Sequence, residues 1–136
     1  MNADIEFREA FKKRLKQFAL RVIKLYQALP KTGEAQVIGK QLLRSATSVA
    51  ANYRASCRAR SKKEFHSKLS IVVEEADETL FWLELLSESG IFSQEKLNPI
   101  TTEALEILKI VAKARKNTTF NPSVPQSLNP STPQSL

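Results

Sequence analysis

The chain has 136 residues, 42% of them hydrophobic, and its 21 Lys and Arg against 14 Asp and Glu give a formal net charge of +7. With one cysteine (Cys57) and one histidine (His66), an internal disulfide framework and a Cys/His zinc site are both excluded. The N-terminus is charged from Asp4 onward and no window approaches the roughly 18 apolar residues of a membrane span, so we expect a soluble cytoplasmic protein without a membrane partner.

The first predicted helix lies before Pro30. Its apolar residues recur every three or four positions, which places them on one helical face: Phe7, Phe11, Leu15, Phe18, Val22, Leu25 and Leu29. Four lysines fall outside this face: Lys12, Lys13, Lys16 and Lys24. The pattern predicts an amphipathic helix of about six turns.

A second helix is predicted after Thr32, whose hydroxyl can cap it. Its apolar face consists of Ile38, Leu42, Ala46, Val49, Tyr53 and Cys57, and its opposite face carries Lys40, Arg44, Arg54 and Arg58. A third side is lined by small polar residues: Ser45, Ser48, Asn52 and Ser56. Close helix packing explains these better than a serine nucleophile, because no pattern around His66 orients an activating base.

The third predicted helix begins with the capping-box spacing of Ser61 and Glu64 and ends at Gly90. Its core face consists of Phe65, Leu69, Val72, Ala76, Leu80 and Leu83. The run Glu74, Glu75, Asp77 and Glu78 lacks the Glu-x-x-His pairs of a bundle metal site, so we interpret it as a solvated or salt-bridged face and expect no metal.

Four apolar residues of this helix point away from its core face: Ile71, Phe81, Trp82 and Leu85. A monomeric bundle would leave such a strip partly exposed, so it favours a homo-oligomeric contact.

The fourth helix is predicted to open at Ser93 or Asn98, with Pro99 tolerated only in its first turn. We expect its buried side to consist of Leu105, Leu108, Val111 and Ala112. Four helices with short connections predict an all-α, antiparallel up-down four-helix bundle over residues 1–118. The remainder, 119–136, contains the tandem repeat NPSVPQSL and NPSTPQSL, a composition that predicts a disordered tail.

Charge is unevenly spread along the chain. Residues 8–63 contain fifteen basic residues and two acidic ones, whereas residues 64–89 contain seven carboxylates and one lysine. Five cations stand close together where the second and third helices meet: Arg54, Arg58, Arg60, Lys62 and Lys63. Lys62 and Lys63 fall at a helix N-terminus, where the helix dipole disfavours positive charge, so local helix energetics do not explain them.

A phosphate backbone is the external partner that this charge favours, and Lys40, Arg44 and the first-helix lysines extend the basic surface. Few aromatic residues are interleaved with these cations and no base-reading motif is present, so the binding we expect is independent of sequence.

Residues 41–86, QLLRSATSVAANYRASCRARSKKEFHSKLSIVVEEADETLFWLELL, resemble the proteins encoded by intervening sequences of bacterial 23S rRNA genes, a family that includes accessory proteins of diversity-generating retroelements. The matching positions are Arg44, Ser48, Val49, Asn52, Ser61, Glu64 and Phe65. Where many members continue Asn-Ile-Ala-Glu-Gly, this chain has Asn52-Tyr53-Arg54-Ala55-Ser56.

The resemblance implies an up-down four-helix bundle that assembles into ring-like homo-oligomers, commonly pentamers, with a basic surface. It also implies nucleic-acid binding and, in the retroelement branch, partnership with a reverse transcriptase. It names no catalytic residue and no cofactor.

The sequence therefore predicts a non-enzymatic, oligomeric bundle that binds RNA or DNA without sequence specificity. The alternative is a protein-interaction or scaffold module whose basic face pairs with an acidic partner or with a neighbouring subunit.

Overall fold

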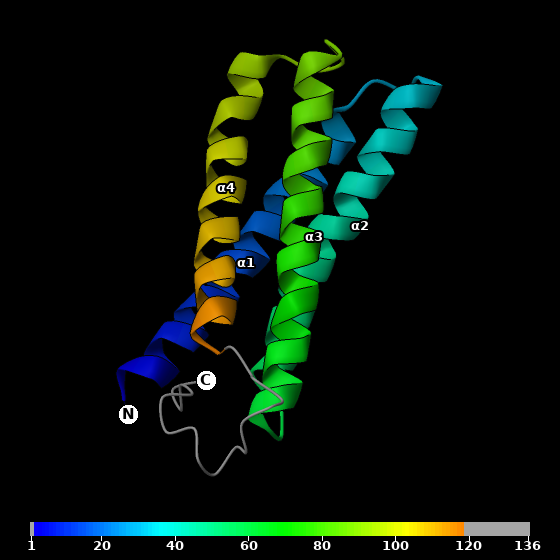
Figure 1. Cartoon of the computed structure of the whole chain (residues 1–136). Coiled ribbons are helices and arrows are strands. Elements are labelled where there is room, and N and C mark those ends of the chain that lie inside the picture. Colours follow the sequence, from blue (N-terminus) through cyan, green and yellow to red (C-terminus); the bar gives the residue numbers. More distant parts are fainter. Residues whose placement is uncertain (1, 119–136) are drawn as a thin grey trace.

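The computed structural model describes residues 2–118, and these fold into four α-helices joined by short loops. The helices are α1 (Ala3–Ala28), α2 (Gly33–Ser56), α3 (Lys62–Glu88) and α4 (Gln94–Asn117). Consecutive helices run in opposite directions (Figure 1), so the predicted all-α, up-down four-helix bundle is confirmed. The predicted disordered tail at 119–136 lies outside the described residues.

Short polar side chains fix the helix ends that the sequence predicts. The Thr32 hydroxyl accepts from the Ala35 amide at 3.4 Å and the Ser61 hydroxyl accepts from the Glu64 amide at 3.0 Å, which satisfies one free donor at each helix start. After α3, Gly90 has a φ of +76°, a left-handed conformation that glycine adopts without strain. These residues therefore fix where α2 and α3 begin and where α3 ends.

The core is a single cluster to which all four helices contribute. Most predicted core positions of the first three helices are buried, including Leu15, Leu42 and Leu69. Phe7 is the exception: it is 52% exposed and stacks on Phe11, so its predicted burial is wrong. The reason is that the first turns of α1 extend past the neighbouring helices (Figure 1).

The buried face of α4 differs from the predicted one. The residues that enter the core are Leu97, Ile100, Ala104, Ile107 and Val111, while Leu105 is 40% exposed. Pro99 lies in the second turn, because α4 starts at Gln94, so its expected restriction to the first turn is wrong. The carbonyl of Glu95 that loses a helical donor to Pro99 belongs to an exposed residue, where water can solvate it.

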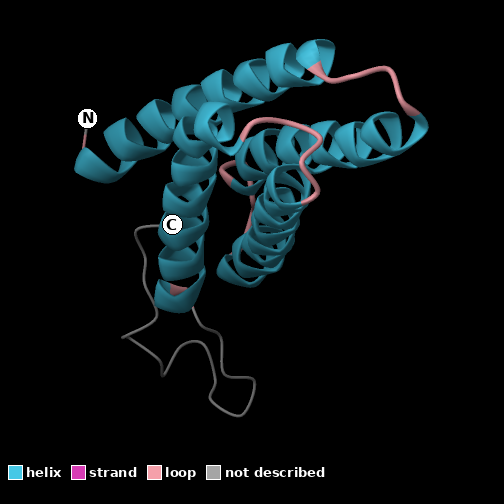
Figure 2. Ribbon diagram, turned by 90° about the horizontal axis from the view of Figure 1, so that it is seen from above, coloured by secondary structure: helices cyan, strands magenta, loops and turns pink. Residues whose placement is uncertain are grey.

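The helix pairs are not equally close. Contact is most extensive between α2 and α3 and sparsest between α1 and α4, and α1 crosses the bundle obliquely (Figure 2). Small hydroxyl residues allow the close α2–α3 approach: the buried Thr79 hydroxyl donates to Ser45 Oγ across the interface at 2.9 Å. This supports the packing interpretation of the small polar side of α2. The outer faces of α1 and α2 are left with a groove between them.

Candidate nucleic-acid interface

A groove of about 550 Å³ lies between α1 and α2. We call it the basic groove, and its lining residues are Glu9, Lys12, Lys13, Lys16 and Ala19 of α1 with Thr47, Ala50, Ala51 and Arg54 of α2 and Arg58 just beyond it. The lysines of α1 lie beside its apolar face at helical spacing, and Arg54 and Arg58 are one turn apart at the end of α2. Five cations therefore converge from two helices.

Little negative charge within the chain balances the basic groove. Glu9 is the one carboxylate among its lining residues, and its side chain already accepts from Lys12 Nζ at 2.7 Å. The hydrogen bond and charge of Lys12 lower the pKa of Glu9, and the charges of Lys13 and Arg54 lower it further. Within residues 2–118, Lys13, Lys16, Arg54 and Arg58 form no ion pair with a carboxylate.

A smaller hollow of about 180 Å³ lies at the α2–α3 turn, which we call the corner. It is lined by the basic side chains of Arg8, Arg60 and Lys62, with Ser56, Cys57, Ala59, Ser61 and Phe65. The Arg8 guanidinium sits 5.6 Å from the centroid of the Phe65 ring, a cation–π distance. The N-terminal part of α1 thus adds positive charge to the corner from a different helix.

The structure brings most of the predicted nucleic-acid-binding residues to this end of the molecule. Arg54 and Arg58 line the basic groove, and Arg60 and Lys62 line the corner. Lys63 is exposed in the first turn of α3, and Lys40 is exposed on α2 but lines neither hollow.

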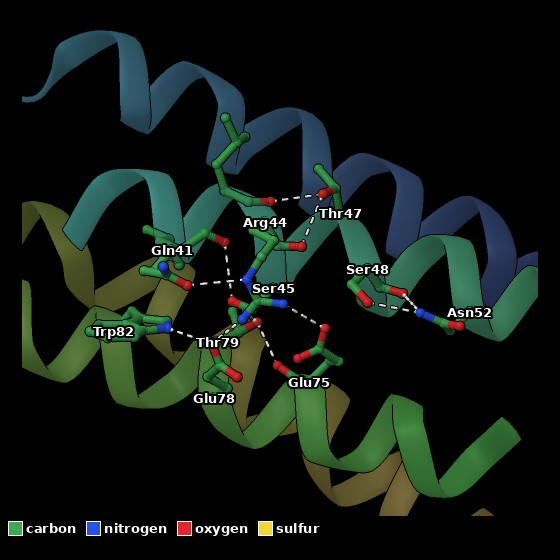
Figure 3. Close-up of polar contacts among 12 residues, drawn as sticks. Gln41, Arg44, Ser45, Thr47, Ser48, Asn52, Glu75, Glu78, Thr79 and Trp82 are labelled. Atoms are coloured by element: carbon green, nitrogen blue, oxygen red, sulfur yellow. Dashed lines mark hydrogen bonds and ion pairs between the residues drawn. The ribbon is translucent and has the colours of Figure 1, made fainter. Parts of the chain in front are cut away.

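Arg44 is paired within the chain with carboxylates of α3 (Figure 3). Its guanidinium donates to Glu75 at 2.9 Å and also to Glu78, both on α3. The hydrogen bond that Arg44 donates to Glu78 is the main cause that raises the pKa of Arg44. Its place on the α2–α3 interface makes Arg44 less available to an outside anion than Arg54 or Arg58.

The acidic residues of α3 that face α2 are part of the same network. Glu78 accepts from Trp82 Nε1 at 2.9 Å, and this bond, ahead of Arg44, lowers the pKa of Glu78. The predicted salt-bridged face is therefore formed by Glu75 and Glu78 with Arg44. No group of three or more metal-ligating side chains occurs in the described part of the chain.

The predicted oligomer contact, the α3 strip, consists of Ile71, Phe81, Trp82 and Leu85. Ile71 is 43% exposed and Phe81 is 50% exposed, while Trp82 and Leu85 are half-buried. Phe81 packs edge-on against Trp82 at 4.9 Å between ring centroids, and Trp82 in turn packs against the core. The α3 strip therefore exposes an aromatic side chain, Phe81, that is supported by a ring packed against the core.

Other polar groups have internal partners. His66 Nδ1 lies 2.9 Å from Thr118 Oγ1 where α3 meets the end of α4, and the buried Ser56 hydroxyl donates to the Tyr53 carbonyl at 2.6 Å.

Among residues 2–118 no helix is long and apolar enough to cross a membrane. The arrangement of the basic groove and the corner can attract and hold anions.

Lys12, Lys13 and Lys16 are the members of the basic groove that the predicted list of site residues left out. The sequence shows them outside the apolar face of α1 and as an extension of the basic surface. Which helix they face depends on how α1 pairs with α2, and no local pattern in the sequence carries that information.

The chain resembles proteins whose activity has not been assigned. A family model described as 23S rRNA-intervening sequence protein matches residues 10–113. A solved structure of a protein with unknown function from the S23 ribosomal protein family of Bacteroides thetaiotaomicron is 36% identical, with a TM-score of 0.74 over 80% of this chain and 97% of that chain. No curated protein matches.

Proposed function

Since the chain belongs to the 23S rRNA-intervening sequence protein family, we propose that it is a non-enzymatic, homo-oligomeric four-helix bundle that binds RNA or DNA without sequence specificity. The observation that carries this proposal is the gathering of cations in two hollows, the basic groove and the corner. Its cations come from three separate segments of the chain: the start of α1, the end of α2 and the start of α3. Phosphates attract such a surface wherever the bases point.

Assembly would strengthen this binding. A homo-oligomer, pentameric as the family resemblance implies, presents the basic surface several times, and each further contact with the same nucleic acid forms at high effective concentration. The same resemblance makes a reverse transcriptase a candidate protein partner. No catalytic residue and no cofactor enters the proposal.

Fluorescence anisotropy of the full chain with labelled RNA and DNA at several salt concentrations tests the proposal. We expect the logarithm of the affinity to fall steeply with the logarithm of the salt concentration. Replacing Arg58, Arg60, Lys62 and Lys63 with Glu should reduce that slope in a protein whose size is unchanged. An absence of binding at low salt would reject nucleic acid as the partner.

A second candidate function is a protein-interaction module, and the acidic outer face of α3 favours it. Glu74, Asp77 and Glu84 are exposed there beside the apolar Phe81. Such a face could pair with the basic surface of another subunit or with a basic partner, just as the basic surface could take an acidic one. Charge reversal of Lys62 and Lys63 separates the two functions, because it should disassemble the oligomer only if the corner pairs with a protein.

A further inference from the structure

The basic groove lacks the internal neutralisation that two arginines elsewhere in the fold have. Arg14 is paired with Glu103 and Arg44 with Glu75, so these arginines are balanced within the chain. In the basic groove, Glu9 is the one lining carboxylate, and its ion pair is with Lys12. Like charges held together in this way repel one another, and an anion between them relieves the repulsion.

The shape of the basic groove suits an extended anion better than a compact one. On α1 its lining runs from Glu9 to Ala19, about 15 Å at 1.5 Å per residue. About four intervals of 3.4 Å along a duplex axis, and so roughly five successive phosphates of one strand, span that length. Its lining includes Ala19, Ala50 and Ala51, whose small side chains leave room for a backbone to approach.

The lining also indicates how the nucleotides are presented. None of the groove-lining residues is aromatic, whereas proteins that hold single strands stack the bases on aromatic rings. Of the rings on α1 and α2, Tyr53 is buried edge-on against Phe11, and Phe7 stacks on Phe11 and does not line the groove. A duplex, whose bases stack on one another inside the helix, loses no stacking interaction when it binds in such a groove.

Resting on the proposed nucleic-acid binding, we infer that the basic groove holds the sugar-phosphate ridge of a double-stranded nucleic acid. Lys12, Lys13 and Lys16 contact the ridge from α1, and Arg54 and Arg58 contact it from α2. A duplex carries one charge per 1.7 Å of its axis, which matches a site that binds through charge and fit to the backbone.

The test compares a labelled 20-base-pair DNA duplex, the corresponding RNA duplex and a 20-nucleotide single strand, with the full chain, across a salt series. We expect either duplex to bind about tenfold or more tightly than the single strand, because the duplex has the denser charge and the groove offers no stacking surface.

Two variants then locate the duplex. Lys13→Gln with Lys16→Gln should lower the salt slope by about 1.8 for each groove in contact, since each phosphate contact contributes about 0.9. The matched control is Lys109→Gln with Lys113→Gln on α4, which removes two exposed lysines about one helical turn apart from a helix that does not line the groove. Ala51→Leu narrows the groove without changing any charge and should weaken duplex binding severalfold.

The outcomes distinguish this inference from the proposed function. Equal affinity for duplex and single strand, an unaltered affinity in Ala51→Leu, or an equal loss in the α4 control would overturn the groove assignment while nucleic-acid binding stands. Failure of every probe to bind at low salt would overturn both.

Discussion

At the residue scale, the charged side chains divide by whether the fold itself neutralises them. Arg14 donates through two nitrogens to both carboxylate oxygens of Glu103, at 2.8 and 2.7 Å, and this two-point pair links α1 with α4. Such bidentate pairs are stronger than single contacts. Because α1 and α4 have few direct contacts, this pair adds a link between them beyond the shared core.

The Arg14–Glu103 pair makes stability depend on pH. The hydrogen bond from Arg14 holds the pKa of Glu103 below its usual 4.5, so the stabilisation is present above that value and is lost as the pH falls through the lowered pKa. We expect Glu103→Gln to reduce the free energy of unfolding by about 1 kcal/mol at pH 7 and to have little effect near pH 3. Urea unfolding of both proteins at several pH values measures this.

Glu106→Gln is the matched control for that experiment. Glu106 lies 3.9 Å from the same arginine nitrogen and its side chain is 59% exposed, so its loss should cost only a few tenths of a kcal/mol. A difference between wild type and Glu103→Gln that is the same at pH 7 and pH 3 would contradict the assignment.

At the element scale, the sequence predicts what depends on neighbours along the chain. Helical spacing and capping residues are local, so the four helices and the Thr32 and Ser61 caps were predictable. The buried face of α4 was not predictable, because apolar residues occur on several sides of that helix. Its packing in the bundle, mainly on α3, buries Ile100, Ala104 and Ile107 and leaves Leu105 exposed. In the candidate site too, some residues cluster along the sequence and others are brought together only by helix packing.

The cations of the corner are close in sequence, and their clustering was predictable for that reason. The basic groove joins residues about 40 positions apart, and it exists because α1 packs on α2 at one particular rotation. The packing of α2 on α3 took Arg44 out of the predicted surface, since its ion-pair partners come from α3. Tertiary pairing of helices decides these points, and helical periodicity does not encode it.

One glycine governs how closely α1 and α2 meet at their connected end. A Cβ added to the buried Gly39 would lie 2.6 Å from Leu29 Cδ1 and 3.0 Å from Tyr26 Cδ1. Glycine-to-alanine replacement within a helix normally gains about 1 kcal/mol, whereas overpacking costs about 1 to 3 kcal/mol. We therefore expect Gly39→Ala to lower the free energy of unfolding by about 1 kcal/mol, as measured by urea denaturation.

Gly33→Ala provides the comparison, because a Cβ at Gly33 meets nothing within 4 Å. That change should leave stability unchanged or raise it by up to about 1 kcal/mol. If Gly39→Ala were instead as stable as Gly33→Ala, Leu29 and Tyr26 would have to shift without cost, and the close approach would not depend on glycine.

At the scale of the whole molecule, the basic surface and the α3 strip lie on different parts of the chain. The basic groove and the corner occupy α1, the end of α2 and the α2–α3 turn, whereas the α3 strip and the acidic residues beside it lie further along α3. Two different surfaces on one subunit suit head-to-tail assembly, in which a patch meets a different patch of the next copy and a ring closes. Nucleic-acid binding and self-association can then use different faces.

This separation predicts that assembly can be removed while the fold is kept. Ile71 and Phe81 are exposed, so Ile71→Gln with Phe81→Gln should leave the unfolding midpoint nearly unchanged. In an oligomer joined through the α3 strip, the same change removes an aromatic anchor and an aliphatic contact, and light scattering after gel filtration should show a shift toward monomer mass.

Leu105→Gln is the control for that shift, because Leu105 is similarly exposed but lies on α4. An oligomer that keeps its mass in the α3 double variant, or that dissociates equally in the control, would place the contact elsewhere. If the double variant is monomeric, its affinity for duplex should fall while its salt slope per subunit stays, since the basic groove belongs to a single chain and only its multiplicity is lost.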